Sequence, residues 1–160
     1  MRSLPLRYRF LRRLGSGAAG GVYLVEDRVH GGPPVALKRL EYSSDPAFRS
    51  SFAREFAVLS SLSLPGVAQV YDLGRMPSGQ EVPEGPFFTR AFVDSEPLDE
   101  WARTRELEEV VAQLVRVLEL VSRLHRVGIV HGDLKPANVV IDREQSHHLI
   151  DFGLSARLGS

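Results

Sequence analysis

The stretch HGDLKPAN at residues 131–138, followed by DFG at residues 151–153, decides how this chain is interpreted. It places an acid (Asp133), a lysine (Lys135) and an amide (Asn138) close together, and a second acid (Asp151) lies shortly downstream. Phosphoryl transfer needs such a set: a carboxylate that orients a hydroxyl, oxygen ligands for a magnesium ion, and a cation near the transferring phosphate. The spacing therefore indicates phosphoryl-transfer chemistry.

Glycines gather upstream of this stretch, in GSGAAGGV at residues 15–22. The pattern G-x-G-x-x-G-x-V lets a backbone approach phosphate oxygens without Cβ clashes. Dinucleotide-binding folds share these glycines, but they require a helix next, whereas VYLV at residues 22–25 continues as a strand. This context favours a β-hairpin over phosphates, with a plain flexible hairpin turn as the alternative.

A lysine follows in VALK at residues 35–38. Strand side chains alternate, so Ala36 and Lys38 share one face, where they could pack under an adenine and contact its phosphates. The candidate partner of Lys38 is Glu55, which lies between Phe52 and Leu59 on an apolar helix face, where a carboxylate needs a cation. The alternative is a solvated lysine and a solvated glutamate.

These motifs, in this order, resemble eukaryotic-type protein kinases over nearly the whole chain. The resemblance implies that Asp133 accepts or orients the substrate hydroxyl proton, and that Lys135 neutralises charge on the phosphoryl group and accompanies Ser/Thr specificity. It implies ATP and Mg²⁺ as cofactors, with Asn138 and Asp151 as metal ligands, and a protein substrate. The implied nucleotide-binding residues are Gly15, Ser16, Gly17, Gly20, Val22, Ala36, Lys38, Glu55, Ala91, Val93 and Val140.

The expected fold class is α+β and protein-kinase-like. Residues 1–93 are expected to form a small ATP-binding lobe with five antiparallel strands and one helix, and residues 94–160 the hinge and part of a mainly helical large lobe. Hydrophobic periodicity and turn residues predict the elements. The expected strands are 8–14, 22–26, 35–40, 67–73, 86–93, 139–141 and 149–150, and the expected helices are 46–62, 98–102 and 106–127.

Two of these predictions concern packing. The helix at 106–127 is expected to pack through one apolar stripe, formed by Val110, Leu114, Val117, Val121 and Leu124. The last two strands are expected to form a hairpin that brings Asn138 and Asp151 together. His131 and Phe152 are expected to have packing roles.

The chain departs from the kinase pattern at three positions. Gly132 replaces an arginine that in the family contacts a phosphorylated activation loop, so that control step is expected to be absent. His-Gly-Asp is also found in aminoglycoside and choline kinases, which keeps a small-molecule kinase open. Arg90 falls where the residue bordering the adenine pocket is usually apolar. Ala91 replaces a common glutamate, although adenine is read mainly by backbone groups near Ala91 and Val93.

The chain stops at Ser160, soon after the DFG motif, so the remainder of a kinase domain is expected to be absent. The stripe on the long helix would then lack partners, and a marginally stable or aggregation-prone chain is expected. Three interpretations follow: a Ser/Thr protein kinase or its nucleotide-binding part, a truncated non-catalytic binding module, and a small-molecule kinase. Further domains in a longer parent chain are also expected.

Composition restricts the partners. The 20 basic and 20 acidic residues balance, so no general attraction to nucleic acid or membranes is implied. Cysteine is absent, which excludes disulfides and thiolate metal sites. No apolar run resembles a signal peptide or approaches the roughly 20 residues that span a bilayer. A cytoplasmic protein is therefore expected.

Overall fold

The computed structural model describes residues 7–17, 20–40 and 46–157. The chain divides into two compact units. The first comprises Met1–Phe52 and Val70–Phe92, and the second comprises Ala53–Gln69 and Val93–Ser160. A single helix, α1 (Pro46–Ser60), contains the boundary between Phe52 and Ala53. The helix begins at the expected Pro46 and ends two residues before the expected Leu62.

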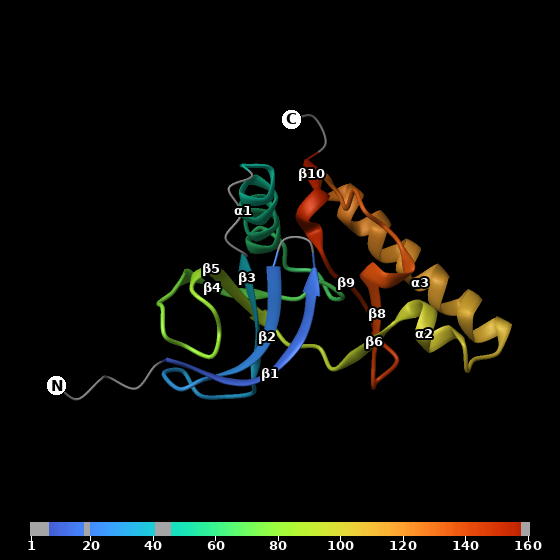
Figure 1. The fold of residues 1–160 in the computed structure, drawn as a ribbon. Helices are drawn as coiled ribbons and strands as arrows, with labels where there is room; N and C mark the ends of the chain where they lie inside the picture. The colour runs from blue at the N-terminus through green and yellow to red at the C-terminus, as the bar shows by residue number, and fades with distance from the viewer. Residues whose placement is uncertain (1–6, 18–19, 41–45, 158–160) are drawn as a thin grey trace. The chain divides into compact units, whose positions relative to one another are not determined.

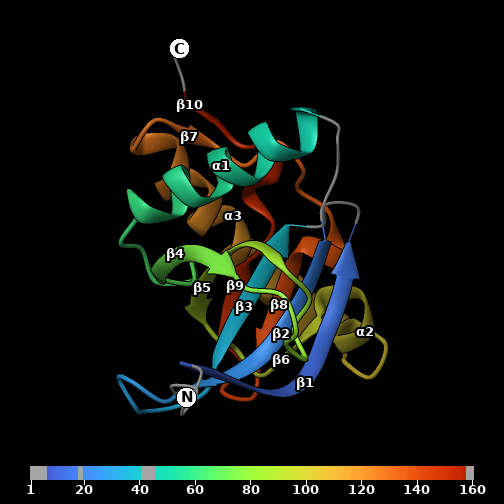
Figure 2. The same cartoon turned by 60° about the vertical axis from the view of Figure 1, so that its left-hand side comes forward.

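The first unit contains a five-stranded antiparallel sheet (Figures 1 and 2). Its strand order is β1-β2-β3-β5-β4, and every neighbouring pair runs antiparallel. The expected α+β, kinase-like fold class is confirmed. The strands are β1 (Tyr8–Gly17), β2 (Gly20–Asp27), β3 (Val35–Leu40), β4 (Val70–Met76) and β5 (Gly85–Ala91).

One face of this sheet carries an apolar core. Tyr23 and Leu37 lie directly opposite each other on β2 and β3, and both are buried. Val82, from the β4–β5 connection, packs into the same cluster. On the other face, the buried Phe88 stacks on Phe52 of α1, with ring centroids 5.0 Å apart. The alternation of these side chains gives the sheet two distinct faces.

The fourth strand begins three residues later than expected. Residues 67–73 were predicted as a strand, but β4 covers Val70–Met76. Val67 instead forms an isolated bridge with Leu149, and its amide donates to the Leu64 carbonyl in a turn. Val67, the apolar residue at which the strand was expected to begin, thus pairs with a residue of the second unit instead of joining the sheet.

The second unit combines helices with short strands. Its elements are α2 (Leu98–Ala102), α3 (Leu107–Arg126), a three-stranded sheet of β6 (Ser95–Pro97), β8 (Val139–Asp142) and β9 (His147–Leu149), a pair of β7 (Ile129–Val130) with β10 (Ala156–Arg157), and the 3-10 turns η1 (Pro136–Asn138) and η2 (Phe152–Leu154). Glu106 and Glu109 form a capping box at the start of α3. Arginine and histidine residues occupy its last turn, where positive charge interacts favourably with the negative end of the helix dipole.

The buried face of α3 overlaps the expected stripe only in part. Val117 and Leu124 are buried as expected, and Val110 and Val121 are partly buried, whereas Leu114 is 43% exposed. The other buried residues are Gln113 and Leu120. Gln113 can lie on this face because its amide donates to the Gln145 carbonyl at 3.1 Å. This bond forms only when the β8–β9 turn packs on the helix, so helical periodicity alone found Val117 and Leu124 but could not show that Gln113 and Leu120 share their face.

A second, exposed apolar face runs along α3. Leu107 is 75% exposed and Leu118 is 62% exposed, and Val111, Leu114 and Val115 lie between them. These residues recur at helical spacing, so they form a continuous stripe separate from the buried face. This exposed stripe is consistent with the expected tendency to aggregate.

Shortening a leucine side chain is expected to cost much more stability on the buried face of α3 than on its exposed face. Leu120→Ala is expected to lower the free energy of unfolding by about 2–5 kcal/mol, because Leu120 is fully buried and its loss leaves a cavity. Leu118→Ala is the matched control, and its effect is expected to stay within about 0.5 kcal/mol. Urea unfolding of both variants measures the difference. Equal losses would contradict the assigned rotation of α3.

Among the described residues, no helix combines the length and apolar character needed to cross a membrane.

Residues 53–69 group with the second unit, although they were expected in the small lobe. The Gly66 carbonyl accepts a hydrogen bond from the Leu149 amide at 2.8 Å, and the Arg157 guanidinium donates to the Ser61 hydroxyl at 3.1 Å. These bonds link the segment after α1 to the last strands. The expected boundary between two lobes stays a prediction.

Candidate active site

The candidate catalytic loop runs from β7 to β8. Pro136 is the first residue of the turn η1, a position where a backbone N–H would have no partner within the turn. The backbone N–H of Asn138 donates to the Lys135 carbonyl at 2.9 Å and completes the turn. Residues 131–138 are thereby held between two short strands. The motif therefore forms one compact loop between β7 and β8 rather than an extended segment.

Asp133 is the one acidic residue of this loop, and two neighbouring side chains hold its carboxylate. Its carboxylate accepts from the Lys135 ammonium at 2.7 Å and from the Asn138 side-chain amide at 2.9 Å. The same amide donates to the Asp133 carbonyl at 2.8 Å. The Lys135 ammonium, together with Asn138, holds the pKa of the Asp133 carboxyl below its usual range. Asp133 is therefore ionised at neutral pH and fixed in orientation. The structure brings together three of the residues expected to carry the chemistry.

His131 lies beneath the loop as a buried, neutral support. Its Nε2 is 2.9 Å from the Ile150 carbonyl oxygen, and the Asp133 amide donates to its Nδ1 at 3.3 Å. One neutral tautomer, with the proton on Nε2, satisfies both bonds. Burial lowers the pKa of His131, which favours that form. Its ring stacks on Phe152, with centroids 4.6 Å apart. His131 and Phe152 therefore have packing roles.

Asp151 follows β9 in an unusual backbone conformation. Its φ of 62° and ψ of 72° lie in the left-handed region, which aspartate tolerates better than most residues. The Ile150 amide donates to the Asn138 carbonyl at 3.0 Å, and Val139 pairs with Leu149. The β8–β9 hairpin, whose second strand covers His147–Leu149 rather than the expected 149–150, thus brings the Asn138 backbone beside Ile150, the residue that precedes Asp151. The joint use of Asn138 and Asp151 as metal ligands stays a prediction.

The predicted nucleotide-binding residues of the first unit share one region of the sheet. Gly15 pairs with Val22 in the β1–β2 hairpin, and Val22 lies directly opposite Lys38 on β3. Ala36 is buried, two residues from Lys38 on the same face. The remaining members of the loop extend the hairpin, with Ser16 opposite Gly21 and Gly17 opposite Gly20. Ala18 and Ala19 lie outside the described residues.

The other predicted nucleotide-binding residues are distributed between the units. Ala91 ends β5 in the first unit, and Val93 is the first residue of the second segment of the second unit. Val140 is buried in β8. Lys38 belongs to the first unit, whereas the buried Glu55 belongs to the second. Their ion pair stays a prediction, as do the binding roles of all these residues.

Comparison with known proteins agrees with these motifs. A family model described as the protein kinase domain matches residues 8–160. The chain belongs to the protein kinase family. The DNA damage-responsive serine/threonine-protein kinase RqkA of Deinococcus radiodurans is 36% identical over 157 residues, which cover 94% of this chain and 22% of that protein. Serine/threonine-protein kinase PrkC of Bacillus subtilis is 31% identical over 159 residues, covering 96% of this chain and 24% of that protein.

Serine/threonine-protein kinase PknB of Mycobacterium tuberculosis (strain ATCC 25177 / H37Ra) is 31% identical over 158 residues, which cover 93% of this chain and 24% of that protein. The chain therefore spans about a quarter of the length of these curated relatives. Membership of the family rests on the kinase domain, which the match covers from β1 to the end of the chain.

This protein kinase chain carries an unusual arginine on the sheet face that bears Ala36 and Lys38. Arg90 lies directly opposite Ala36 on β3 and Val70 on β4. Residues opposite each other on neighbouring strands point to the same face, so Arg90 shares a face with Ala36 and Lys38. The alternation of side chains along β5 shows which residues share a face with Arg90. Placing Ala36 and Lys38 on that same face also requires the β3–β5 register, which the structure supplies.

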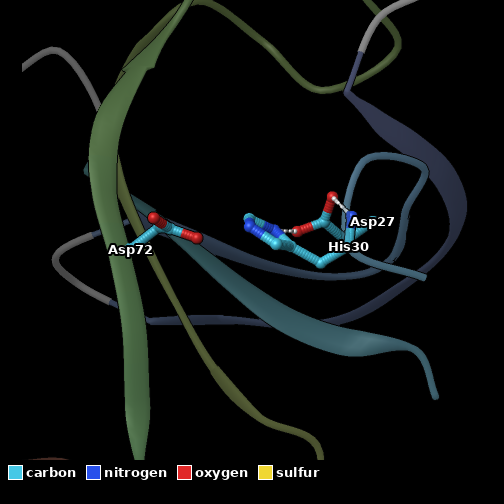
Figure 3. Close-up of side chains that lie close together, drawn as sticks. All are labelled: Asp27, His30 and Asp72. Carbon is cyan, nitrogen blue, oxygen red and sulfur yellow. Dashed lines mark hydrogen bonds and ion pairs between the residues drawn. The ribbon is translucent and has the colours of Figure 1, made fainter. Parts of the chain in front are cut away.

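A charged cluster at the edge of the same sheet escaped the sequence analysis. Figure 3 shows Asp27, His30 and Asp72 gathered within reach of one another. Their ligand atoms lie within 4.8 Å of each other, a spacing that could hold a metal ion. The Arg7 guanidinium fills the position instead: Nη2 is 2.8 Å from Asp27 and 2.9 Å from His30, and it also pairs with Asp72. The cluster is an ion-pair network.

Asp27 is expected to contribute measurably to stability. The Arg7 guanidinium holds the pKa of the Asp27 carboxyl well below its usual range, and the carboxylate side chain is only 10% exposed. Asp27→Asn is expected to lower the free energy of unfolding by about 2 kcal/mol at neutral pH. Because folding depresses this pKa, the contribution is full above the unfolded value of about 4 and is lost as the pH falls through the folded value.

Urea unfolding between pH 2 and pH 7 checks this prediction, because the contribution of Asp27 decreases below about pH 4, toward its lowered folded-state pKa. Glu26→Gln is the matched control, because Glu26 pairs with Arg9 at 2.7 Å on an exposed part of the same sheet. Its expected effect is at most about 1 kcal/mol. A similar loss of unfolding free energy in both variants, with the same pH dependence, would show that the Arg7–Asp27 pair stabilises the fold no more than an exposed ion pair does.

Proposed function

We propose that this chain performs, or forms the nucleotide-binding part of a kinase that performs, ATP-dependent phosphoryl transfer to serine and threonine hydroxyls of proteins. The observation that carries the proposal is the ionised Asp133, fixed by Lys135 at 2.7 Å and by Asn138 at 2.9 Å. Because the relatives extend far beyond the matched region, the activity, substrates and partners of a whole protein are part of this proposal.

Asp133 would orient the attacking hydroxyl and accept its proton late. Its lowered pKa makes it a weak base, so orientation is its main contribution and proton transfer follows once bond formation has acidified the hydroxyl. Lys135 keeps a full positive charge, because the Asp133 carboxylate raises its pKa. That charge would stabilise negative charge on the phosphoryl oxygens. His131 remains neutral and buried and takes no part in proton transfer.

The residues present fit a magnesium–nucleotide complex. Asn138 uses its amide nitrogen for both bonds to Asp133, which leaves its side-chain oxygen as a ligand, and Asp151 offers a carboxylate. Amide and carboxylate oxygens are the ligands that Mg²⁺ prefers. When bound, the metal would shield the phosphate charges of ATP. Gly15, Ser16, Gly17, Gly20 and Val22 would cover those phosphates with backbone amides.

Lys38 would contact the same phosphates, and Glu55 would orient it. Glu55 is 3% exposed, and a buried carboxylate requires compensation by a cation or by hydrogen bonds. Ala36 and Val140 would pack against the adenine, and the backbone near Ala91 and Val93 would read its edge. We also propose a cytoplasmic location, because a chain without cysteine needs no oxidising compartment.

A transfer assay tests the proposal. The purified chain is incubated with γ-labelled ATP, Mg²⁺ or Mn²⁺, and in separate reactions a mixture of acceptor proteins, aminoglycosides or choline. Label in phosphoserine or phosphothreonine supports the proposal. Label only in a small molecule would replace it with the second candidate, a small-molecule kinase, which Gly132 favours. Nucleotide binding without any transfer would indicate a non-catalytic module.

A further inference from the structure

Two residues other than glycine have a positive φ in the part of the chain that the structure describes: Gln145 and Asp151, each at 62°. Gln145 lies in the turn of the β8–β9 hairpin, and Asp151 follows shortly after its second strand. A short polar residue such as aspartate tolerates this left-handed conformation, whereas a long side chain such as glutamine rarely adopts it. The conformation of Gln145 therefore needs contacts that compensate for its strain.

Gln145 is hydrogen-bonded to two helices at once. Its side-chain Oε1 accepts from the indole Nε1 of Trp101, in α2, at 2.9 Å, and its carbonyl oxygen accepts from the side-chain amide of Gln113, in α3, at 3.1 Å. Trp101 is 4% exposed and Gln113 is 3% exposed. Their N–H groups therefore need acceptors within the protein, and a single residue of the turn supplies one to each.

The turn around Gln145 is closed by its own hydrogen bonds. The Gln145 amide donates to the Asp142 carbonyl at 3.0 Å, and the Asp142 amide donates to the Ser146 carbonyl at 2.9 Å. The Asp142 carboxylate accepts from the backbone amides of Glu144 at 2.9 Å and Ser146 at 2.8 Å. The turn therefore moves as one body, and the two bonds of Gln145 fix that body against α2 and α3.

The same hairpin carries the candidate metal ligands at its other end. There the Ile150 amide donates to the Asn138 carbonyl at 3.0 Å, and Asp151 comes next in the chain. Three residue pairs in register connect this end to the turn, a length of roughly 10 Å. Strand β8 also pairs with β6 along its length. A hairpin that is bonded throughout and held along one strand transmits a tilt of its tip to its base.

We propose that Gln145 is a positioning residue: its two bonds hold the tip of the hairpin on α2 and α3, and this attachment sets the relative placement of Asn138 and Asp151 at the base. The role rests on the proposed function, because it concerns how the candidate ligands of the magnesium–nucleotide complex are arranged. Gln145 lies at the opposite end of the hairpin and acts through it. Loosening the tip is therefore expected to weaken metal-dependent nucleotide binding without changing any ligand.

A matched pair of substitutions in the turn isolates this attachment. Gln145→Asn keeps the amide group and suits a left-handed backbone, but it shortens the side chain by one methylene, so that the side chain no longer reaches Trp101. Glu144→Asp shortens the neighbouring exposed side chain by the same methylene and leaves the backbone amide that the turn uses unchanged. Both variants are made in the full 160-residue chain, and their thermal melts establish that they are folded.

Hydrogen exchange resolved by NMR is the first readout. Gln145→Asn is expected to raise exchange about tenfold or more at the indole N–H of Trp101 and at the amides of Asn138 and Ile150, which report the base of the hairpin. Glu144→Asp is expected to leave all three unchanged. A rise confined to Trp101 and the turn would show a purely local role and would overturn the proposal, as would equal exchange in the two variants. This readout needs no nucleotide, so it tests the attachment independently of the proposed function.

Nucleotide binding measured by calorimetry is the second readout, with ATP alone and with Mg-ATP as the probes. Gln145→Asn is expected to raise the Kd for Mg-ATP about tenfold, as for other residues that orient metal ligands, and to leave the Kd for ATP alone unchanged. An equal change with and without the metal would overturn the positioning role and leave the proposed function intact. Absence of Mg-ATP binding to the folded, unmodified chain would overturn the proposed function, and the positioning role with it.

Trp101→Phe tests the same bond from the helix side and covers the case in which Gln145→Asn does not fold. Phenylalanine keeps a buried aromatic ring but has no indole N–H, so the hydrogen bond to Gln145 is lost. The same rise in exchange at Ile150 and the same loss of Mg-ATP affinity are expected. Combining the two substitutions is expected to add little, because both remove one bond. An unchanged Mg-ATP affinity in the folded Trp101→Phe variant would overturn the proposal.

Discussion

Replacing Asp133 by asparagine is expected to lower the rate of phosphoryl transfer by about 10²–10⁴-fold, the usual contribution of a positioned general base. Asparagine keeps the shape of the side chain but loses the charge that pairs with Lys135 at 2.7 Å. Affinity for ATP is expected to change little, because Asp133 would contact the hydroxyl and not the nucleotide. Steady-state kinetics with a protein acceptor measure kcat and KM separately.

The control for this variant is Asp94→Asn. Asp94 is a surface aspartate of the same unit, 53% exposed and paired with the exposed Arg143 at 2.8 Å. Surface pairs of this kind contribute little, so kcat is expected to be unchanged. If Asp133→Asn kept the full rate, Asp133 could not be the catalytic residue, and any measured transfer would need another base.

Replacing Asp151 by asparagine is expected to abolish the metal-dependent part of nucleotide binding. For the unmodified chain, a magnesium–nucleotide complex at a hundred times its Kd is expected to add about 2.7 kcal/mol of stability, or about 5–10 °C in Tm. The variant is expected to lose most of this gain, because an amide replaces the carboxylate that would bind the metal. Asparagine tolerates the left-handed backbone at position 151, so the fold should persist.

Thermal melts with ATP alone, with Mg-ATP and with neither ligand test this prediction. Asp142→Asn is an unsuitable control, because Asp142 binds His148 and two backbone amides. Asp99→Asn, an exposed substitution in α2, is suitable. A metal-dependent rise of equal size in Asp151→Asn would exclude Asp151 as a ligand. No rise in the folded, unmodified chain would favour a non-catalytic module.

Much of the fold follows from local patterns in the sequence. Alternating apolar residues and glycine-rich turns predicted the five-stranded sheet, and the long helix was predicted to within one residue at each end. Strand β6 is not among the expected strands, because Ser95, Glu96 and Pro97 have low strand propensity. Its pairing with β8, where Ser95 lies opposite Asp142, makes it a strand. Propensity could not reveal a partner about 45 residues away.

The buried face of α3 was predicted only in part, and the reason is also tertiary. The predicted stripe of Val110, Leu114, Val117, Val121 and Leu124 includes two buried residues, Val117 and Leu124, but its member Leu114 is exposed, because α3 has apolar residues on more than one side. The hydrogen bond from Gln113 to the Gln145 carbonyl selects the face that is buried. A polar residue on a core face can be recognised only when its partner is known.

The sequence by itself determined the residue types of the candidate active site and their order, because phosphoryl transfer needs particular functional groups at short separations along the chain. It therefore predicted Asp133, Lys135, Asn138 and Asp151 as site residues and indicated the protein kinase family, which the family match shows. Tertiary structure decided how these groups are oriented: the bonds that fix Asp133, the neutral tautomer of His131, and the backbone contact of Gly132 with Leu154. The contacts of His131 and Gly132 join segments about 20 residues apart, and their geometry depends on how the intervening hairpin packs, which no local pattern encodes. The bonds that fix Asp133 are local, and their geometry depends on the turn η1.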